Sequence, residues 1–328
     1  MKTSLVLPLL GLLSLCPISA TAQQSDGAER YPARPVKLIV PYGAGAAADV
    51  IARIVTQKLS EDIGAQFYVE NLPGAGSVIG TLAAARAPAD GYTLLLVNQD
   101  FVIQPLVKSK PGYDPFNNFI AVASLAAAPE TISVHPSVPA TSMEELIALL
   151  KANPGKYSYA SPGYGTSPHI AVERLLKLGH NLDVVQVPFQ GGGAAVMSTL
   201  AGHTQILHIT LPLVAGHIQE GKLRGLAVAD TKRSSLVPDV PTLNEAGIAK
   251  HEVGYWTGIM VPAATPDRIV SLLNQAVGKV LSSSDVKERL AKIGFEPMPG
   301  TAESFAHHIR AEAAEWGRVI ARANIRID

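Results

Sequence analysis

The sequence is almost without cysteine. Its single cysteine, Cys16, lies in an N-terminal segment that begins with Lys2, continues as an apolar run and ends in Ala-Thr-Ala at 20–22. This arrangement is typical of a secretory signal peptide, and it is too short for a membrane span. We expect cleavage after Ala22, which leaves a mature chain with no disulfide, thiolate metal site or cysteine nucleophile.

Export without disulfides favours a bacterial periplasmic protein that folds on its hydrophobic core alone. A lipid anchor on Cys16 is the alternative. It is weakened because Leu15, and not a small residue, precedes the cysteine.

An excess of charge of either sign is also lacking, with 27 basic and 27 acidic residues. Removal of residues 1–22, which contain one lysine and no acid, leaves 26 against 27 and a formal charge of −1. A near-neutral chain without basic clusters carries no electrostatic footprint for nucleic acid. No later apolar run is long enough to cross a bilayer, so we expect a soluble mature protein.

Motifs of common enzyme classes are missing. The sequence has no Gly-Lys-Ser/Thr and no G-x-S-x-G, so Ser77 and Ser161 are not predicted nucleophiles. None of the nine histidines has metal-ligand spacing. His203 and His208 would point to opposite faces of an expected strand, and the adjacent pair at 307–308 diverges on a helix. We expect no catalytic residue, no metal and no cofactor.

What the sequence does contain is a repeated order of apolar strand, glycine-rich turn and helix. It occurs at VKLIVPYGAG (36–45), FYVENLPGAGS (67–77), YSYASPGYGTS (157–167) and VVQVPFQGGG (184–193). Such alternation predicts an α/β protein with mostly parallel sheets. Ligands of these sheets bind beyond the carboxyl ends of the strands, where the glycines lie.

Two helix–sheet halves are expected. Domain I covers 31–128 and 256–328, and domain II covers 129–255, with a new strand beginning near Pro129. Two amphipathic helices, over 266–281 and 302–323, end the chain. The return to domain I predicts two crossings and a hinge.

The loop GAGAAA at 43–48 suits an anion, because a helix N-terminus presents backbone N–H groups and a positive dipole end. It also matches the loose dinucleotide fingerprint G-x-G-x-x-A, with Glu70 as a candidate ribose partner. Pro41 at the end of the strand and export from the cytoplasm count against a nucleotide.

Three further features have two interpretations each. The glycines at 191–193 indicate close approach of a ligand or backbone, or a flexible turn. The PGAG at 73–76 is a second anion-binding turn or a loop that lets a helix pack closely. His169, which opens a helix, contacts ligand or has a capping or packing role.

The order of YPARPVKLIVPYGAGAAADVIARIV, VENLPGAGSVIG, ADGYTLLL, VHPSVPATSMEEL, YASPGYGTSPHIAVERL, VPFQGGGAAV, GKLRGLAV and VPDVPTLNEAG resembles the Bug family of periplasmic solute receptors. These are the binding components of tripartite tricarboxylate transporters. The resemblance covers nearly all of the mature chain. It implies a periplasmic-binding-protein-like type II fold, a "Venus flytrap" of two doubly wound domains joined by a two-crossing hinge. It also implies capture of a small carboxylate between the domains without catalysis.

The resemblance implies transporter membrane components as partners, with a sensor kinase as the alternative recipient; we expect a monomer. An exported NAD-binding or hydrolytic enzyme is the alternative function. The expected ligand-binding residues are Tyr42, Gly43, Ala44, Gly45, Ala46, Asn98, Gln99, Ser161, Gly163, Thr166, Ser167, His169, Gln190, Gly191, Gly192 and Gln205.

The chain departs from the family pattern in two of these segments. The family's Gly-Gly-x-Thr-Asp reads Gly-Ala-Ala-Ala-Asp at 45–49, and Gly-Gly-x-Val-Asp reads Ala-Gly-His-Thr-Gln at 201–205. The first change removes a glycine and a hydroxyl, and the second replaces a carboxylate with an amide. The ligand therefore stays open, and a typical dicarboxylate is expected to bind weakly or not at all.

Overall fold

The structure is a computed structural model that describes residues 31–248 and 254–327. The predicted signal peptide, its cleavage site after Ala22 and the rival anchor at Cys16 lie outside the described residues. Helices within the described ranges are too short or too polar to cross a membrane.

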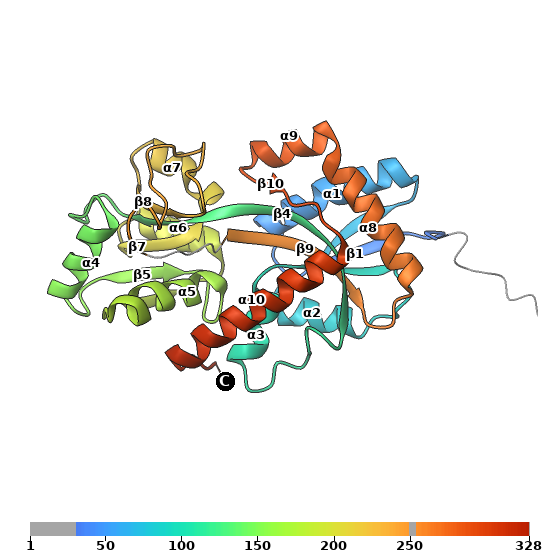
Figure 1. Cartoon of the computed structure of the whole chain (residues 1–328), viewed down its shortest axis with the longest axis horizontal. Helices are drawn as coiled ribbons and strands as arrows, with labels where there is room; N and C mark the ends of the chain where they lie inside the picture. The colour runs from blue at the N-terminus through green and yellow to red at the C-terminus, as the bar shows by residue number, and fades with distance from the viewer. Residues whose placement is uncertain (1–30, 249–253, 328) are drawn as a thin grey trace, which may run out of the picture.

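Two lobes share one long strand, β4 (Phe119–Val134), which runs through both of them (Figure 1). The strand order is β2-β1-β3-β9-β4-β7-β5-β6, with β8 and β10 also paired to β4. In the first lobe the strands are β1 (Val36–Val40), β2 (Phe67–Asn71), β3 (Thr93–Val97), β9 (Gly254–Pro262) and β10 (Glu296–Pro297). In the second lobe they are β5 (Ser158–Ser161), β6 (Val185–Pro188), β7 (Ile206–Thr210) and β8 (Arg224–Ala229).

Helices cover both faces of the first lobe, and this explains its unbroken apolar strands. Val36, Leu38 and Val40 of β1 face one core, whereas Ile39 faces the other. A strand buried on both faces reads as a continuous hydrophobic run. One face carries α1 (Ala47–Ile63), α8 (Asp267–Ser282) and α9 (Ser284–Lys292), and the other carries α2 (Val78–Ala85), α3 (Asp100–Val107) and α10 (Ala302–Ala323).

The second lobe follows the same plan with smaller helices. One core lies under α4 (Met143–Ala152), α5 (Ser167–Val172) and the π-helix η2 (Glu173–Leu178). The other lies under α6 (Gly192–Leu200), the 3-10 turn η3 (Leu211–Leu213) and α7 (Ala215–Gln219). Figure 1 shows α10 extending from the first lobe toward α5, and Ile170 and Ala171 of α5 join the first lobe's core. The lobes therefore touch away from the strands as well.

The fold is the expected two-lobed α/β type II binding-protein fold, with one correction at the crossing. The strand expected to begin near Pro129 is instead the second half of β4, which is continuous from Phe119, so one strand path links both lobes. Pro129 lies opposite Gly254 of β9 in an antiparallel pair. The chain crosses between the lobes in β4 and β9, and these strands add antiparallel pairs to the parallel sets β2-β1-β3 and β6-β5-β7.

Candidate ligand-binding site

The first glycine-rich loop is held in place by Asp49, which is only 2% exposed. Its carboxylate accepts hydrogen bonds from the Gly45 N–H at 2.8 Å, the Asn71 side-chain amide at 2.8 Å and Arg53 Nε at 3.0 Å. Burial alone would raise the pKa of Asp49, but these donors hold it below its usual range. Gly43, Ala44 and Gly45 stay exposed at the carboxyl end of β1, directly before α1. The first N–H groups of a helix have no partner within it, so this loop offers donors to an anion.

A chain of hydrogen bonds joins that loop to the second lobe. The Tyr42 hydroxyl donates to Asn98 Oδ1 at 2.5 Å, and Asn98 Oδ1 also accepts from the Asp100 N–H at 2.9 Å. Asp100 Oδ1 accepts from the Ser167 N–H at 3.0 Å, at the start of α5. Tyr42, Asn98 and Ser167, all expected at the site, are therefore brought together through Asp100.

Asp100 is a buried acid at this junction. Burial raises its pKa to about 6, which the hydrogen bonds from Ser167 and Tyr42 only partly oppose. Burial, and next the charge of Asp100, raise the pKa of Tyr42 well above its ordinary value. Tyr42 is therefore a neutral donor at physiological pH.

The second-lobe loop at 161–167 is also internally bonded. The Thr166 hydroxyl donates to the Gly163 carbonyl at 2.8 Å, although Thr166 occupies the N-cap position of α5. Gln186 Nε2 donates to Ser161 Oγ at 2.8 Å. The side chains are thus engaged with the protein, and they fix the shape of the loop.

His169 is a packing residue of this loop. Its Nδ1 accepts the Gly165 N–H at 3.0 Å, and its ring meets Tyr164 edge-on with centroids 5.8 Å apart. Burial lowers the pKa of His169 to about 4, so the ring is neutral at pH 7. Of the two interpretations made from the sequence, this geometry favours packing over ligand contact.

The triple glycine adjoins the same loop. Gly191 has a left-handed φ of 99°, and its N–H donates to the Pro162 carbonyl at 3.2 Å. Helix α6 begins at Gly192. A Cβ added at Gly193 would meet no atom within 4 Å. This open space and the start of a nine-residue helix support close approach of a ligand here.

Two of the expected residues, Gln205 and Gln99, are not brought together with the rest. Gln205 lies at the amino end of β7, where its Oε1 accepts from the Ser158 N–H at 3.0 Å, at the opposite end of β5 from Ser161. The Gln99 amide donates to the Gly254 carbonyl at 2.5 Å, where the strands pass between the lobes. Gln190 is exposed beside Gly191, and its side chain makes no hydrogen bond among the described residues. We leave Gln99 and Gln205 out of the proposed site.

Sequence reasoning missed two side chains at the junction, Asp100 and Gln104. Gln104 Nε2 donates to the Gly165 carbonyl at 3.0 Å. Helix α3 therefore makes two hydrogen bonds to the second-lobe loop, one from Gln104 and one to Asp100. Asp100 follows Asn98 and Gln99 directly at the carboxyl end of β3. This position at a strand end was the sequence signal that could have identified Asp100 as a residue of the junction. The signal for Gln104 was weaker, because nothing in its spacing separates it from a surface glutamine.

The structure shows the surroundings of two features that the sequence left with alternative roles, the 73–76 loop and Glu70. The loop at 73–76 packs closely, because a Cβ at Gly76 would lie 2.6 Å from Gln104 Nε2, and Lys108 Nζ donates to the Ala75 carbonyl at 2.9 Å. Glu70, the candidate ribose partner, forms an ion pair with Lys37 at 2.9 Å. No group of three potential metal-ligating side chains occurs within residues 31–248 and 254–327.

Three cavities of the described chain are not lined by residues 43–46, 161–167 or 191–193, although the third adjoins this last segment through Phe189 and Ala194. The first, of about 570 Å³, lies between η2 and α10; the second, of about 290 Å³, lies beside Pro129 and Gly254; the third, of about 520 Å³, lies along β6 and α6. The first glycine-rich loop at 43–45 is exposed, and an exposed loop encloses little volume. We therefore place the candidate site by its backbone donors and the bonds between the lobes.

Comparison with known proteins identifies the family of this chain. The model of the tripartite tricarboxylate transporter family receptor matches residues 51–325. Protein BugT of Bordetella pertussis is 32% identical over 97% of this chain and 98% of its own length. The structure of R. palustris Rpa4515 with adipate superposes with a TM-score of 0.84 at 31% identity, covering 90% of this chain and 99% of that one.

MatC of Rhodopseudomonas palustris, with bound malate, has a TM-score of 0.81 at 28% identity over 88% of this chain and all of its own. These matches span both lobes. This chain therefore belongs to the tripartite tricarboxylate transporter receptor family, the Bug proteins, and is a periplasmic solute-binding receptor.

Proposed function

We propose that this receptor captures a small carboxylate between its lobes and delivers it to the membrane components of a tripartite tricarboxylate transporter. The observation that carries the proposal is the series of hydrogen bonds through Tyr42, Asn98, Asp100 and Ser167. It joins the 43–46 loop to the second-lobe loop at 161–167. The adipate-bound and malate-bound relatives support an organic acid as the ligand.

The proposed contacts come from backbone N–H groups at the starts of α1 and α6. A carboxylate accepts such hydrogen bonds without an arginine. We propose that the protein acts as a monomer without catalysis, after removal of residues 1–22. We place its domain boundary where Pro129 lies opposite Gly254, so that the lobes close about β4 and β9.

The test is titration calorimetry and thermal unfolding of residues 23–328 with adipate, with malate, and with hexane-1,6-diol as the uncharged control. An acid at one hundred times its dissociation constant should raise the free energy of unfolding by about 2.7 kcal/mol. The diol should have no effect. Stabilisation by amines alone, with a broad carboxylate set silent, would refute the proposal.

Gly193→Val locates the site. A Cβ there meets no atom within 4 Å and the residue has no left-handed φ, so the free protein should remain folded while the added side chain obstructs the ligand. Gly278→Val is the matched control, because Gly278 on α8 is equally uncrowded and lies outside the proposed loops. Equal acid affinity in the two variants would exclude the α6 N-terminus from the site.

A further inference from the structure

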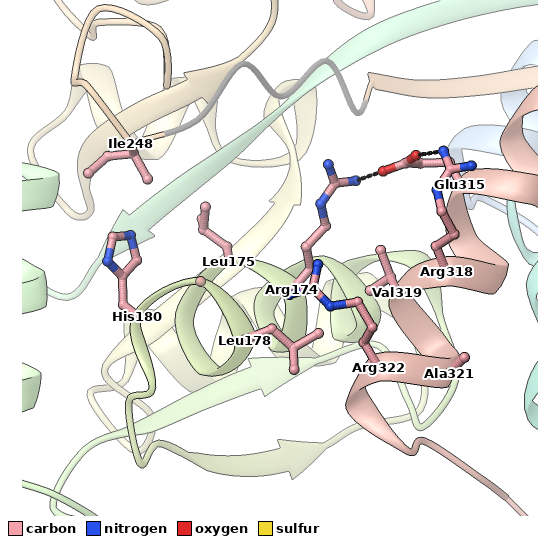
Figure 2. Close-up of a pocket in the computed structure, with 11 residues that line it drawn as sticks. Arg174, Leu175, Leu178, His180, Ile248, Glu315, Arg318, Val319, Ala321 and Arg322 are labelled. Carbon is pink, nitrogen blue, oxygen red and sulfur yellow. Dashed lines mark hydrogen bonds and ion pairs between the residues drawn. The ribbon is translucent and has the colours of Figure 1, made fainter.

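The cavity of about 570 Å³ between η2 and α10 is separate from the proposed carboxylate site. One wall belongs to the second lobe and the other to the long C-terminal helix (Figure 2). Its volume falls in the range of small-molecule sites. The 161–167 loop lies at the other end of the α5–η2 helical segment, so an occupant here would not meet the first loop.

Positive charge dominates this cavity. Arg174, Arg318 and Arg322 line it together with one acid, Glu315. Arg174 Nη1 lies 2.9 Å from Glu315 Oε1, and Arg318 pairs with the same carboxylate. Burial lowers the pKa of His180, which leaves that ring uncharged at neutral pH. One carboxylate thus pairs with two guanidinium groups while a third, Arg322, is also present, and the lining residues that the structure describes carry a net charge of +2.

The guanidinium groups stand beside an apolar surface. Leu175, Leu178 and Val319 form part of the same lining, and Figure 2 shows Leu178 between the two helices near Arg322. Arg174 is partly desolvated, with 27% of its side chain exposed. The wall that carries Arg174 and Leu178 is a π-helix, a rare form that occurs often at functional sites.

We propose that this cavity binds an anionic amphiphile, with a carboxylate on the arginines and a short hydrocarbon chain on the leucine and valine side chains. Guanidinium groups pair with carboxylates through charge-assisted hydrogen bonds. The apolar lining gives a reason for the tail, because a fully hydrophilic anion would leave that surface wet. The site is independent of the carboxylate site between the lobes.

The probe is octanoate, titrated calorimetrically into residues 23–328 that already hold saturating adipate or malate, whichever binds. We expect saturable octanoate binding, with octan-1-ol and butyrate each binding at least about tenfold more weakly, since each lacks one half of the recognition. A protein without any bound small acid is titrated in parallel, so failure of the receptor assignment is visible separately.

Arg322→Gln and Arg174→Gln locate the octanoate. Arg322 is exposed and forms no ion pair with another described residue, so its loss should not disturb folding. We expect octanoate affinity to fall about fivefold in Arg322→Gln and at least about tenfold in Arg174→Gln. Arg268→Gln on α8 removes an exposed arginine far along the chain from the cavity and should bind as the parent does.

Three results would overturn the proposal. They are no saturable octanoate binding to the parent protein, octanol binding as tightly as octanoate, and equal octanoate affinity in Arg322→Gln and Arg268→Gln. The last result would place octanoate elsewhere on the molecule, including the site between the lobes.

Discussion

At the residue scale, Thr166 shows how a neighbour decides what a hydroxyl can do. From its place ahead of a helix, the hydroxyl could cap α5 or donate to a carboxylate. In the structure it does neither, because its proton is given to the Gly163 carbonyl at 2.8 Å. Only its acceptor lone pairs remain for a ligand, and a carboxylate has no proton to offer them.

Thr166→Val keeps the volume and removes this bond. We expect the free energy of unfolding to fall by about 1 kcal/mol and the affinity for a bound acid to change less than about threefold. Thr166→Ser, which keeps the hydroxyl, is the control. Denaturant unfolding beside calorimetry measures both quantities. A tenfold loss of affinity at unchanged stability would show that the hydroxyl donates to the ligand after all.

At the element scale, the docking of α10 on β9 depends on the absence of one side chain. A Cβ at Gly258 would overlap the ring of Phe305. That ring is 1% exposed and packs edge-on against Trp256 with centroids 5.6 Å apart. The ring cannot shift without disturbing its neighbours, because protein interiors are close-packed.

Gly258→Ala should therefore destabilise the protein by about 2–3 kcal/mol through overpacking. Gly278→Ala lies in the interior of α8 with no atom within 4 Å of the new Cβ. There the same change should stabilise by up to about 1 kcal/mol through helix propensity. Urea unfolding of the two variants compares them directly. A Gly258→Ala protein as stable as the parent would mean that α10 packs less tightly than this contact requires.

At the scale of the whole molecule, two buried acids lie where the lobes meet. Burial, followed by the charges of Asp100 and Glu312, raises the pKa of Glu130 to about 8, and burial raises that of Asp100 to about 6. His208 Nδ1 approaches Glu130 Oε2 to 3.4 Å. Glu130 follows Pro129, which lies opposite Gly254 at the crossing.

The sign of the pH dependence follows from these two raised values. Between the ordinary pKa of a carboxyl group and the raised one, the folded state binds more protons than the unfolded state. The contribution of Asp100 and Glu130 to the free energy of unfolding is therefore fully present below about pH 4. It is lost as the pH rises through about 6 for Asp100 and about 8 for Glu130. His169, whose pKa is lowered to about 4, acts in the opposite direction between about pH 4 and 6.5.

Asp100→Asn isolates one contribution, because Asn still accepts the Ser167 N–H and carries no charge. We expect the variant to gain stability over the parent as the pH rises from 4 to 7, by an amount on the order of 3 kcal/mol. Denaturant unfolding at pH 4, 5.5 and 7 measures the gain. Parallel stability profiles for variant and parent would show that Asp100 does not titrate in this range.

Much of the fold was predictable because it depends on local pattern. The expected strands at 67–71 and 93–97 and the helix at 302–323 coincide with β2, β3 and α10. Each has a side-chain period that its own residues set. The crossing was less predictable. Pro129 suggested a new strand, whereas β4 continues through it because the position lies opposite Gly254 at the junction of the lobes.

The site was predictable in its backbone and less so in its side chains. The glycine-rich turns at the ends of β1 and β5 and before α6 can be recognised in the sequence, because a positive φ or an uncrowded helix start favours glycine. The partners of Asp100 and Gln104 lie more than sixty residues away in the second lobe, and their contacts arise only when the lobes meet.

The sequence by itself determined an α/β protein with glycine-rich loops, because strand alternation, helix period and turn chemistry are properties of short segments. The receptor function followed from the resemblance to the Bug family. Only the tertiary structure decided that Gln205 accepts a hydrogen bond from Ser158 at the far end of β5 and that the Thr166 hydroxyl donates to the Gly163 carbonyl. It also decided that three arginines line one cavity between η2 and α10. Hydrogen bonds and charges act over a few ångströms, so which groups they join depends on the folded distances between segments and not on their order in the chain.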